Sequence, residues 1–445
     1  MEVTSSHCVE SIMNYFMASK SKKTIAVVGL WHLGSVYLAS LAKLGFKVTG
    51  YDLDTKVINN FKKGIPPLFE PKLQEFLTKF AKNISYTSKE SDLKGKDYMY
   101  ITHDLVVDAY DVGEVSIMKK LFTLISKYCN EKTIVVISSQ VPAGTSRLLV
   151  RMLERKGIRF PKVIYFPENL RLGTAFDSFL APDRVIIGSD SKEALEQFKK
   201  DFDFGSPIIT MGLESAELVK HALNCYLATC ISLSSELSDV AELVGANMND
   251  VVKALKLDKR VSQFAPINPG LGFAGGTLGR DIQSIKMITK PHKYTPKLLD
   301  AVNKVNQDRL PHVLSKIRNV YPALTSKKIG MLGLTYKPNT NTLRRSMAIW
   351  LAEMLHAKGA VIKAYDPVIT SKIKEHSYIQ IATSVELFAQ DLDMIVLMTD
   401  WKEFLDIDVV FLSSLLKHKV IVDTKNFLDR NMYEKLGFRY IGIGI

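Results

Sequence analysis

The run Thr24-Ile-Ala-Val-Val-Gly29-Leu-Trp31-His-Leu-Gly34 decides the first domain of this 445-residue chain. Its apolar start predicts a buried strand, and the turn after it approaches the Gly-x-Gly-x-x-Gly pattern that joins strand to helix in dinucleotide-binding folds. Gly29 and Gly34 are the first and third glycines of that pattern. Trp31 stands where a second glycine would let the backbone approach a pyrophosphate.

Asp52 ends the next strand candidate, roughly twenty residues on, where such folds place a carboxylate on the ribose of NAD. The same carboxylate would repel the 2′-phosphate of NADP. We therefore predict that NAD binds at Gly29, Trp31, Gly34 and Asp52. Two alternatives stay open: the Trp31 indole crowds the pyrophosphate, or Asp52 is only a turn residue at a strand end.

Strand and helix patterns alternate outward from this run, which is typical of a parallel sheet with crossover helices. Further strand candidates are Lys47–Tyr51, Tyr98–Thr102, Thr133–Ile137, Val163–Phe166 and Arg184–Ile187. A helical pattern without glycine or proline then runs from Ser215 to Val244 and ends before Gly245. Alternation resumes at Lys328–Leu332.

The sequence also repeats itself. Leu44-Gly-Phe-Lys-Val-Thr-Gly-Tyr-Asp52 resembles Lys358-Gly-Ala-Val-Ile-Lys-Ala-Tyr-Asp366, and each follows a strand that ends in Gly-Leu, at Gly29-Leu30 and Gly333-Leu334. We therefore predict an α/β chain: two Rossmann-like doubly wound parallel-sheet domains joined by a long-helix connector. The expected segments are an extension at 1–22, the NAD-binding domain at 23–212, the connector at 213–322 and the second domain at 323–445.

Composition narrows the class of protein. Hydrophobic residues make up 47% and charged residues 24%, the balance of a soluble globular protein. No apolar run approaches the roughly 18 residues of a membrane-spanning helix, and residues 1–20 lack the features of a signal peptide. The four cysteines show no metal-ligand spacing. We expect a cytoplasmic protein without a metal site or a membrane partner.

The net charge of +13 comes from lysines and arginines spread along the chain. A nucleic-acid binder would gather them in a stripe with aromatic residues interleaved, so we expect no nucleic-acid partner. The excess of positive charge suits anionic substrates such as nucleotide diphosphates.

Ordered motifs extend from Lys23 to Gly444. They are Pro67-Leu-Phe-Glu70-Pro71, Val141-Pro-Ala-Gly-Thr145, Pro167-Glu168-Asn-Leu170 with Pro182-Asp183-Arg184, Lys220-His-Ala-Leu-Asn224, Gly270-Leu-Gly272-Phe273-Ala-Gly275-Gly-Thr277-Leu-Gly-Arg280-Asp281, Gly333-Leu-Thr-Tyr-Lys337-Pro338-Asn339-Thr340 with Arg344 and Ser346, Thr399-Asp400-Trp401, and Asp423-Thr-Lys425-Asn426. In this order they resemble the motifs of the UDP-glucose/GDP-mannose dehydrogenase family, which oxidises C6 of a nucleotide-linked hexose to the carboxylate with two NAD and a covalent cysteine.

The resemblance implies roles for the catalytic residues. Lys220 and Asn224 lie four apart on one helix and would present an ammonium and an amide to one point, stabilising an oxyanion and positioning water. Asp281 would accept the proton, and Glu168 would activate the water that releases the acid. The plainer alternatives are a solvated helix face for Lys220 and Asn224, and helix-start positions for Glu168 and Asp281.

The resemblance also implies binding residues and partners. Lys337 would contact the substrate, Gly272 and Phe273 are further substrate-binding candidates, and Arg260 would reach the sugar across a dimer interface unless it is an ordinary exposed charge. Arg344 would contact the cofactor. The expected partners are a UDP-sugar, bound by the second domain, and a second copy of the chain. The helix from Ser215 is apolar on more faces than one domain can cover, and its candidate dimer positions are Leu218, Ala222, Tyr226, Ile231 and Leu237.

The chain departs from the family pattern where the chemistry occurs. Thr277 occupies the position of the catalytic cysteine, and a threonine hydroxyl is a far weaker nucleophile than a thiolate. Other departures are Trp31, Leu105-Val106, Gln140, Leu172, Gly279 and Arg280. We expect an NAD-dependent oxidoreductase whose second oxidation is in doubt. The alternatives are a non-catalytic nucleotide-sugar-binding protein and, disfavoured by the second Rossmann domain, a hydroxyacid or 6-phosphogluconate-type dehydrogenase.

Overall fold

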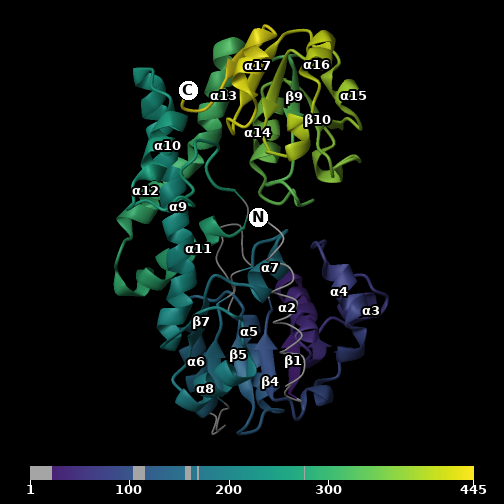
Figure 1. The fold of residues 1–445 in the computed structure, drawn as a ribbon, viewed down its shortest axis with the longest axis vertical. Helices are drawn as coiled ribbons and strands as arrows, with labels where there is room; N and C mark the ends of the chain where they lie inside the picture. Colours follow the sequence, from purple (N-terminus) through teal and green to yellow (C-terminus); the bar gives the residue numbers. More distant parts are fainter. Residues whose placement is uncertain (1–22, 104–115, 156–161, 168–169, 275) are drawn as a thin grey trace, which may run out of the picture. The chain divides into compact units, whose positions relative to one another are not determined.

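The computed structural model describes residues 23–103, 116–155, 162–167, 170–274 and 276–445 (Figure 1). The chain divides into two compact units, 1–222 and 223–445. Their boundary lies within α9 (Leu213–Val244), the long helix that the sequence predicts. Each unit is built around one sheet.

The sheet of the first unit has the strand order β3-β2-β1-β4-β5-β6-β7-β8. Its strands are β1 (Thr24–Val28), β2 (Lys47–Tyr51), β3 (Ile84–Thr87), β4 (Tyr98–Ile101), β5 (Ile134–Ile137), β6 (Lys162–Tyr165), β7 (Val185–Gly188) and β8 (Ile208–Met211). Neighbouring strands are parallel except at the junction of β6 and β7, where Tyr165 pairs antiparallel with Gly188. The predicted parallel sheet and its six strand candidates are confirmed, whereas β3 and β8 were not predicted.

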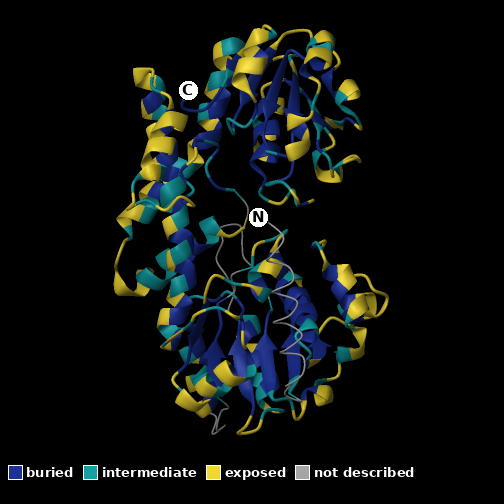
Figure 2. Ribbon diagram, viewed as in Figure 1, coloured by how far each residue is buried: buried dark blue, intermediate teal, exposed yellow. Residues whose placement is uncertain are grey.

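Alternate residues of β1 supply both faces of this sheet. Ile25 and Val27 pack on one face, and Ala26 and Val28 on the other. Because both faces are covered, the strand is apolar throughout instead of alternating with polar residues. Figure 2 shows the strands as a buried layer among helices that expose their outer sides. The helices are α2 (His32–Lys43), α3 (Thr55–Lys62), α4 (Leu73–Lys79), α5 (Ser116–Ser126), α6 (Thr145–Glu154), α7 (Ala175–Leu180) and α8 (Lys192–Asp201).

The second unit contains a wholly parallel six-stranded sheet of order β11-β10-β9-β12-β13-β14. Its strands are β9 (Lys328–Leu332), β10 (Val361–Tyr365), β11 (Ile379–Ile381), β12 (Met394–Leu397), β13 (Val420–Asp423) and β14 (Arg439–Ile441). After α9, its helices are α10 (Met248–Leu257), α11 (Leu278–Thr289), α12 (Lys297–Gln307), α13 (Arg309–Val320), α14 (Met347–His356), α15 (Val385–Ala389), α16 (Val409–Leu415) and α17 (Arg430–Lys435).

The internal repeat predicted from the sequence has a structural counterpart at the carboxyl end of the first strand of each sheet. Asp52 accepts a hydrogen bond from the Leu30 N–H at 2.8 Å, and Asp366 accepts one from the Leu334 N–H at 2.7 Å. In both units a carboxylate on the second strand thus fixes the turn after the first strand.

A second correspondence lies at the opposite strand ends. Asp97 accepts from the Thr24 N–H at 2.8 Å, and Asp393 accepts from the Lys328 N–H at 2.9 Å. These residues precede β4 and β12, which occupy equivalent places in the two sheets. Two similar mononucleotide-binding folds therefore make up the chain.

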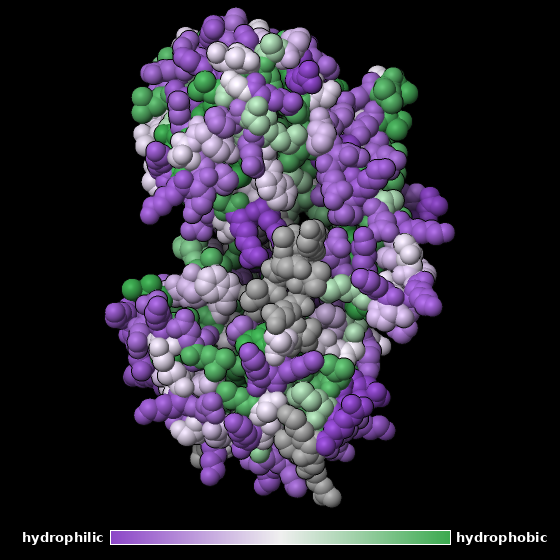
Figure 3. Space-filling view, turned by 180° about the vertical axis from the view of Figure 1, so that it is seen from behind, coloured by the Kyte–Doolittle hydropathy of each residue, from purple (hydrophilic) through white to green (hydrophobic). Residues whose placement is uncertain are grey.

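The face of the molecule in Figure 3 is mainly hydrophilic. Figure 3 shows one face on which hydrophilic residues dominate and hydrophobic residues form small, separate groups. Across the part of the chain that the structure describes, every helix falls short of the length and apolarity that a membrane crossing requires.

Candidate active site

The turn between β1 and α2 has little space at its two glycines. Gly29 has a φ of +96°, and a Cβ there would stand 2.7 Å from the Cα of His103. A Cβ on Gly34 would stand 1.8 Å from the carbonyl oxygen of Gly29. The first glycine makes the turn and the third lets the helix pack against it, as dinucleotide-binding folds require.

Trp31 precedes the first residue of α2 with a φ of −78°, a conformation that any L-residue adopts. Its side chain is 48% exposed. The first turn of α2 contains no acidic residue, so its positive dipole end and backbone N–H groups favour an anion such as a diphosphate. This cradle fits NAD, and the Trp31 backbone takes an ordinary conformation in it. Crowding of the pyrophosphate by the Trp31 side chain stays a prediction.

Asp52 holds the turn through both carboxylate oxygens. One oxygen accepts from the Leu30 N–H, and the other accepts from the Asp54 N–H at 2.9 Å. Both hydrogen bonds to Asp52 stabilise the turn, as expected of a structural turn residue. A carboxylate has about four acceptor positions, so capacity for a ribose hydroxyl remains, and the ribose role stays a prediction.

Glu70, from the Pro67–Pro71 motif, is a buried carboxylate that links two helix starts. It accepts hydrogen bonds from Nε2 of His32 at 2.9 Å, from the Gly173 N–H at 3.0 Å and from the Ala175 N–H at 2.9 Å. Burial alone would raise the pKa of Glu70, but these hydrogen bonds outweigh it and hold the pKa below its usual value. His32 begins α2 and Ala175 begins α7, so an anionic Glu70 fixes both.

Four polar side chains lie buried on about two turns of α9. The exposed fractions are 0% for Glu217, 7% for Lys220, 1% for His221 and 5% for Asn224. Lys220 and Asn224 therefore do not lie on a solvated helix face. Sequence reasoning missed Glu217 and His221, because their partners lie about seventy residues earlier in the chain.

Asp281 is fully buried in the first turn of α11. Its carboxylate accepts a hydrogen bond from Nδ2 of Asn224. The residue at the N-terminal cap of α11 is Thr277, so Asp281 is more than a cap. The amide of Asn224 is thereby oriented by a carboxylate, while Lys220 lies one helical turn before it on α9.

Thr277 is exposed, and its hydroxyl makes no capping hydrogen bond to α11. Two described cysteines are unsuited to replace a catalytic thiolate. Burial raises the pKa of Cys129 to about 12, and burial together with the charge of Asp281 raises the pKa of Cys225 to about 12. At neutral pH both remain thiols.

Some predicted site residues lie outside the described residues. These are Glu168, Leu105, Val106 and Gly275.

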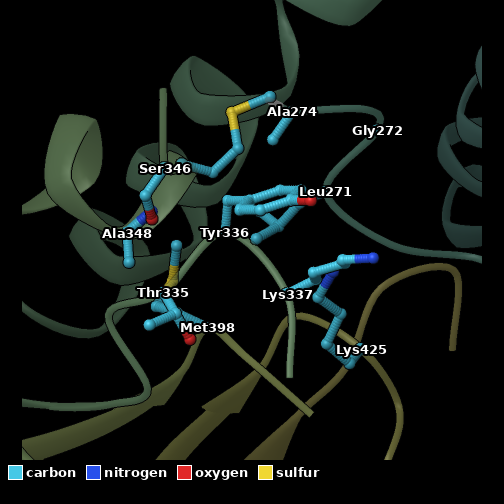
Figure 4. Close-up of a pocket in the computed structure, with 11 residues that line it drawn as sticks. Leu271, Gly272, Ala274, Thr335, Tyr336, Lys337, Ser346, Ala348, Met398 and Lys425 are labelled. Carbon is cyan, nitrogen blue, oxygen red and sulfur yellow. The ribbon is translucent and has the colours of Figure 1, made fainter. Parts of the chain in front are cut away.

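The second unit contains a cavity of about 170 Å³ (Figure 4). It is lined by Leu271, Gly272, Ala274, Thr335, Tyr336, Lys337, Ser346, Met347, Ala348, Met398 and Lys425. The start of α14 and the two lysines bring positive charge to it, which suits a diphosphate. The structure thus brings the predicted Gly272 and Lys337 together, and adds Lys425, which sequence reasoning matched to a motif without giving it a role.

Asn306 holds the loop that forms one side of this cavity. Its Oδ1 accepts from the Phe273 N–H at 2.7 Å, and its Nδ2 donates to the Phe273 carbonyl at 3.0 Å. Gly272 has a φ of +82°, and a Cβ there would stand 2.3 Å from Oδ1 of Asn306. Only glycine therefore permits this backbone path.

Other predicted binding residues lie away from the cavity lining. The Phe273 side chain packs into a small core with Cys225 and Ile282. Arg260 has a side chain that is 88% exposed and pairs with Asp258 at 2.8 Å. Arg344 is exposed in the loop before α14. The roles of Arg260 and Arg344 stay predictions.

Comparison with known proteins matches successive parts of the chain to three domains of one family. Three models of the UDP-glucose/GDP-mannose dehydrogenase family match: the NAD binding domain at residues 23–203, the central domain at 214–308 and the UDP binding domain at 330–430. The UDP-glucose 6-dehydrogenase of Rickettsia felis is 31% identical over 431 residues, which cover 94% of this chain and 96% of that protein. The UDP-glucose 6-dehydrogenase TuaD of Bacillus subtilis is 31% identical over 432 residues, with coverages of 95% and 93%.

Solved structures share the fold. A UDP-glucose dehydrogenase from Pyrobaculum islandicum gives a TM-score of 0.85 at 24% identity, covering 96% of this chain and 98% of that one. A UDP-D-ManNAc dehydrogenase from Pyrococcus horikoshii gives 0.82 at 25% identity, covering 95% and 99%. With its cofactor turn and its positively charged cavity, the chain belongs to the UDP-glucose/GDP-mannose dehydrogenase family and is an NAD-dependent nucleotide-sugar dehydrogenase.

Proposed function

We propose that this chain oxidises the C6 alcohol of UDP-glucose, or of a closely related UDP-hexose, mainly to the aldehyde. The observation that carries the proposal is the buried group Asn224–Asp281, with Lys220 one turn away on α9, beside a position 277 that offers a hydroxyl and no thiol. The names of the relatives and the match to a UDP-binding domain support the choice of substrate.

The residues account for the first oxidation. The alcohol loses a hydride and a proton, and NAD supplies the hydride acceptor at its nicotinamide. The Lys220 ammonium stabilises the developing alkoxide, and the Asn224 amide, held by Asp281, orients the hydroxyl or a water. Asp281 accepts the proton through that water. The products are the 6-aldehyde, NADH and one proton.

The second oxidation lacks covalent capture. In the family pattern a cysteine holds the aldehyde as a thiohemiacetal, which gives up the second hydride. Thr277 can add only reversibly, and the thiols of the buried Cys225 and the half-buried Cys129 remain protonated. A hydrated aldehyde would yield the acid, a second NADH and a proton, but slowly. We propose that Glu168 activates the water that releases the acid. We also propose domain boundaries at 212/213 and 322/323.

The departures at Thr277 and Trp31 also favour a second candidate, a nucleotide-sugar-binding protein without catalysis. The cavity with Lys337 and Lys425 would serve either protein by holding the diphosphate of UDP. The two candidates differ in whether any NADH forms.

We also propose that the chain forms a homodimer through α9. Residues of α9 spaced alternately four and three apart form one apolar seam: Tyr226, Cys230, Leu233, Leu237, Val240 and Val244. All but Cys230, which is half-buried, are exposed in the single chain. This is the heptad spacing of a helix that packs against another helix. Of the predicted dimer positions, Leu218, Ala222, Tyr226 and Leu237 are exposed and Ile231 is half-buried, so a partner can cover them.

Stoichiometry tests the proposed function. With UDP-glucose and NAD, the unaltered protein should form about one NADH per sugar in the initial phase, and a hydrazine reagent should trap the 6-aldehyde. Thr277→Cys should move the ratio toward two, whereas Thr277→Ser should leave it unchanged.

Two NADH per sugar from the unaltered protein, without trapped aldehyde, would show that hydration alone carries the second step. An absence of NADH with every UDP- and GDP-hexose would favour the binding protein instead.

Lys220→Ala and the size-matched Lys220→Met should lower the rate of NADH formation by roughly 10²–10³-fold, because the charge acts on the developing alkoxide. Nucleotide affinities measured by calorimetry should stay within about threefold, because the ground-state contacts remain. Retention of most of the rate in both variants would exclude Lys220 from the chemistry.

The dimer is tested by sedimentation. Leu237→Asp places a charge in the seam and should convert a dimer at micromolar concentration to a monomer. Met432→Asp, an exposed apolar residue of α17, is the matched control and should leave the dimer intact. A monomeric unaltered protein would contradict the proposal.

A further inference from the structure

Glu217 is a carboxylate with no solvent exposure on α9. Its Oε2 accepts from the Gly144 N–H at 2.5 Å, and its Oε1 accepts from the Ser146 N–H at 2.8 Å. Gly144 is the cap residue of α6, has a φ of +93° and has no side chain with which to cap. Glu217 therefore supplies the acceptor that the free N–H groups at this helix start require.

His221 holds the other side of the same loop. Its Nε2 lies 2.9 Å from the Val141 carbonyl oxygen. A carbonyl oxygen can only accept, so Nε2 carries the hydrogen and donates it. One face of α9 thus holds the Val141–Ser146 segment through a carboxylate on one side and an imidazole on the other.

Lys220 lies on the same face of the helix. At about 100° per residue, Glu217, Lys220 and His221 fall within an arc of about 100°. The loop that carries the family's Val-Pro-x-Gly-Thr motif and the helix that carries Lys220 are therefore held in one register. A slip of the loop along α9 would change what the Lys220 ammonium faces.

A buried carboxylate such as Glu217 is an energetically costly way to join α9 to α6 if its role is only structural. Burial raises the pKa of Glu217 in spite of two backbone hydrogen bonds, which reflects the penalty on its charged form. Apolar packing would join two helices without that penalty. The neighbouring contact between the same helices, Glu214 with Arg147, lies at the surface and keeps its charges in water.

We propose that Glu217 and His221 are positioning residues that lock the Val141–Ser146 segment to α9 and thereby direct Lys220 at the reacting alcohol. This inference rests on the proposed function. Neither residue touches the substrate, and each acts through Lys220.

Glu217→Gln tests the proposal, because glutamine keeps the shape while one of its two terminal atoms becomes an amide nitrogen facing a backbone N–H. The hydride-transfer rate with UDP-glucose should fall about 10–100-fold, since small misplacements of catalytic groups cost this much. The isotope effect on kcat with 6,6-dideuterated UDP-glucose should rise, because chemistry becomes rate-limiting. A mere loss of folded protein would lower the rate without changing the isotope effect.

Three further variants complete the test. Glu214→Gln breaks a surface contact between the same two helices and should leave rate and isotope effect unchanged. His221→Leu, which removes the donor to Val141, should reproduce the defect of Glu217→Gln. His221→Gln, which keeps a donor, should restore much of the rate.

An unchanged rate and isotope effect in both Glu217→Gln and His221→Leu would overturn the inference. Should Glu217→Gln fail to fold, the His221 pair decides alone. Failure of the proposed function is recognised separately, as an absence of turnover in the unaltered protein, and it would overturn both.

Discussion

The burial of four polar side chains on one short stretch of α9 is the constraint on which the site depends. A buried polar group without a partner costs several kcal/mol, so each must be satisfied by another part of the chain. Glu217 and His221 bind backbone atoms of the loop before α6, and Asn224 binds the carboxylate of Asp281 on α11. In the first unit, α9 thus holds a loop about seventy to eighty residues earlier in the sequence, and Lys220 lies among the residues that hold it. In the second unit, Asn224 holds Asp281.

The sequence predicted the fold well where periodicity and glycine chemistry are local. The strands β1, β2 and β9 begin and end where expected, because each is a short β-rich run bounded by helical patterns or turn residues. The edge strands β3 and β8 escaped prediction because they are partly exposed and so lack a fully apolar run. Gly272 and Lys337 line one cavity, and their role in substrate binding stays a prediction. Phe273 packs into a core instead, and the partners of Glu217 could not be inferred without the tertiary structure.

The two oxidations depend on different parts of the chain. In the proposed function, alcohol oxidation uses the charge of Lys220, the amide of Asn224 and the carboxylate of Asp281, which lie on α9 and α11. Covalent capture requires a thiolate at position 277, which is the residue before the first turn of α11. Position 277 is exposed whereas Asn224 and Asp281 are buried, so a threonine at 277 is compatible with the buried polar group. On the proposed function, the substitution affects the second oxidation and leaves the residues of the first in place.

The central claim is that this chain retains the first oxidation without a covalent enzyme–sugar intermediate. Intact-protein mass spectrometry of acid-quenched turnover with UDP-glucose and NAD tests it most directly. The account predicts that the quenched polypeptide keeps the mass of the unmodified chain throughout turnover, although NADH accumulates. A species heavier by one UDP-sugar acyl group, located by peptide mapping at any residue of this chain, would contradict it.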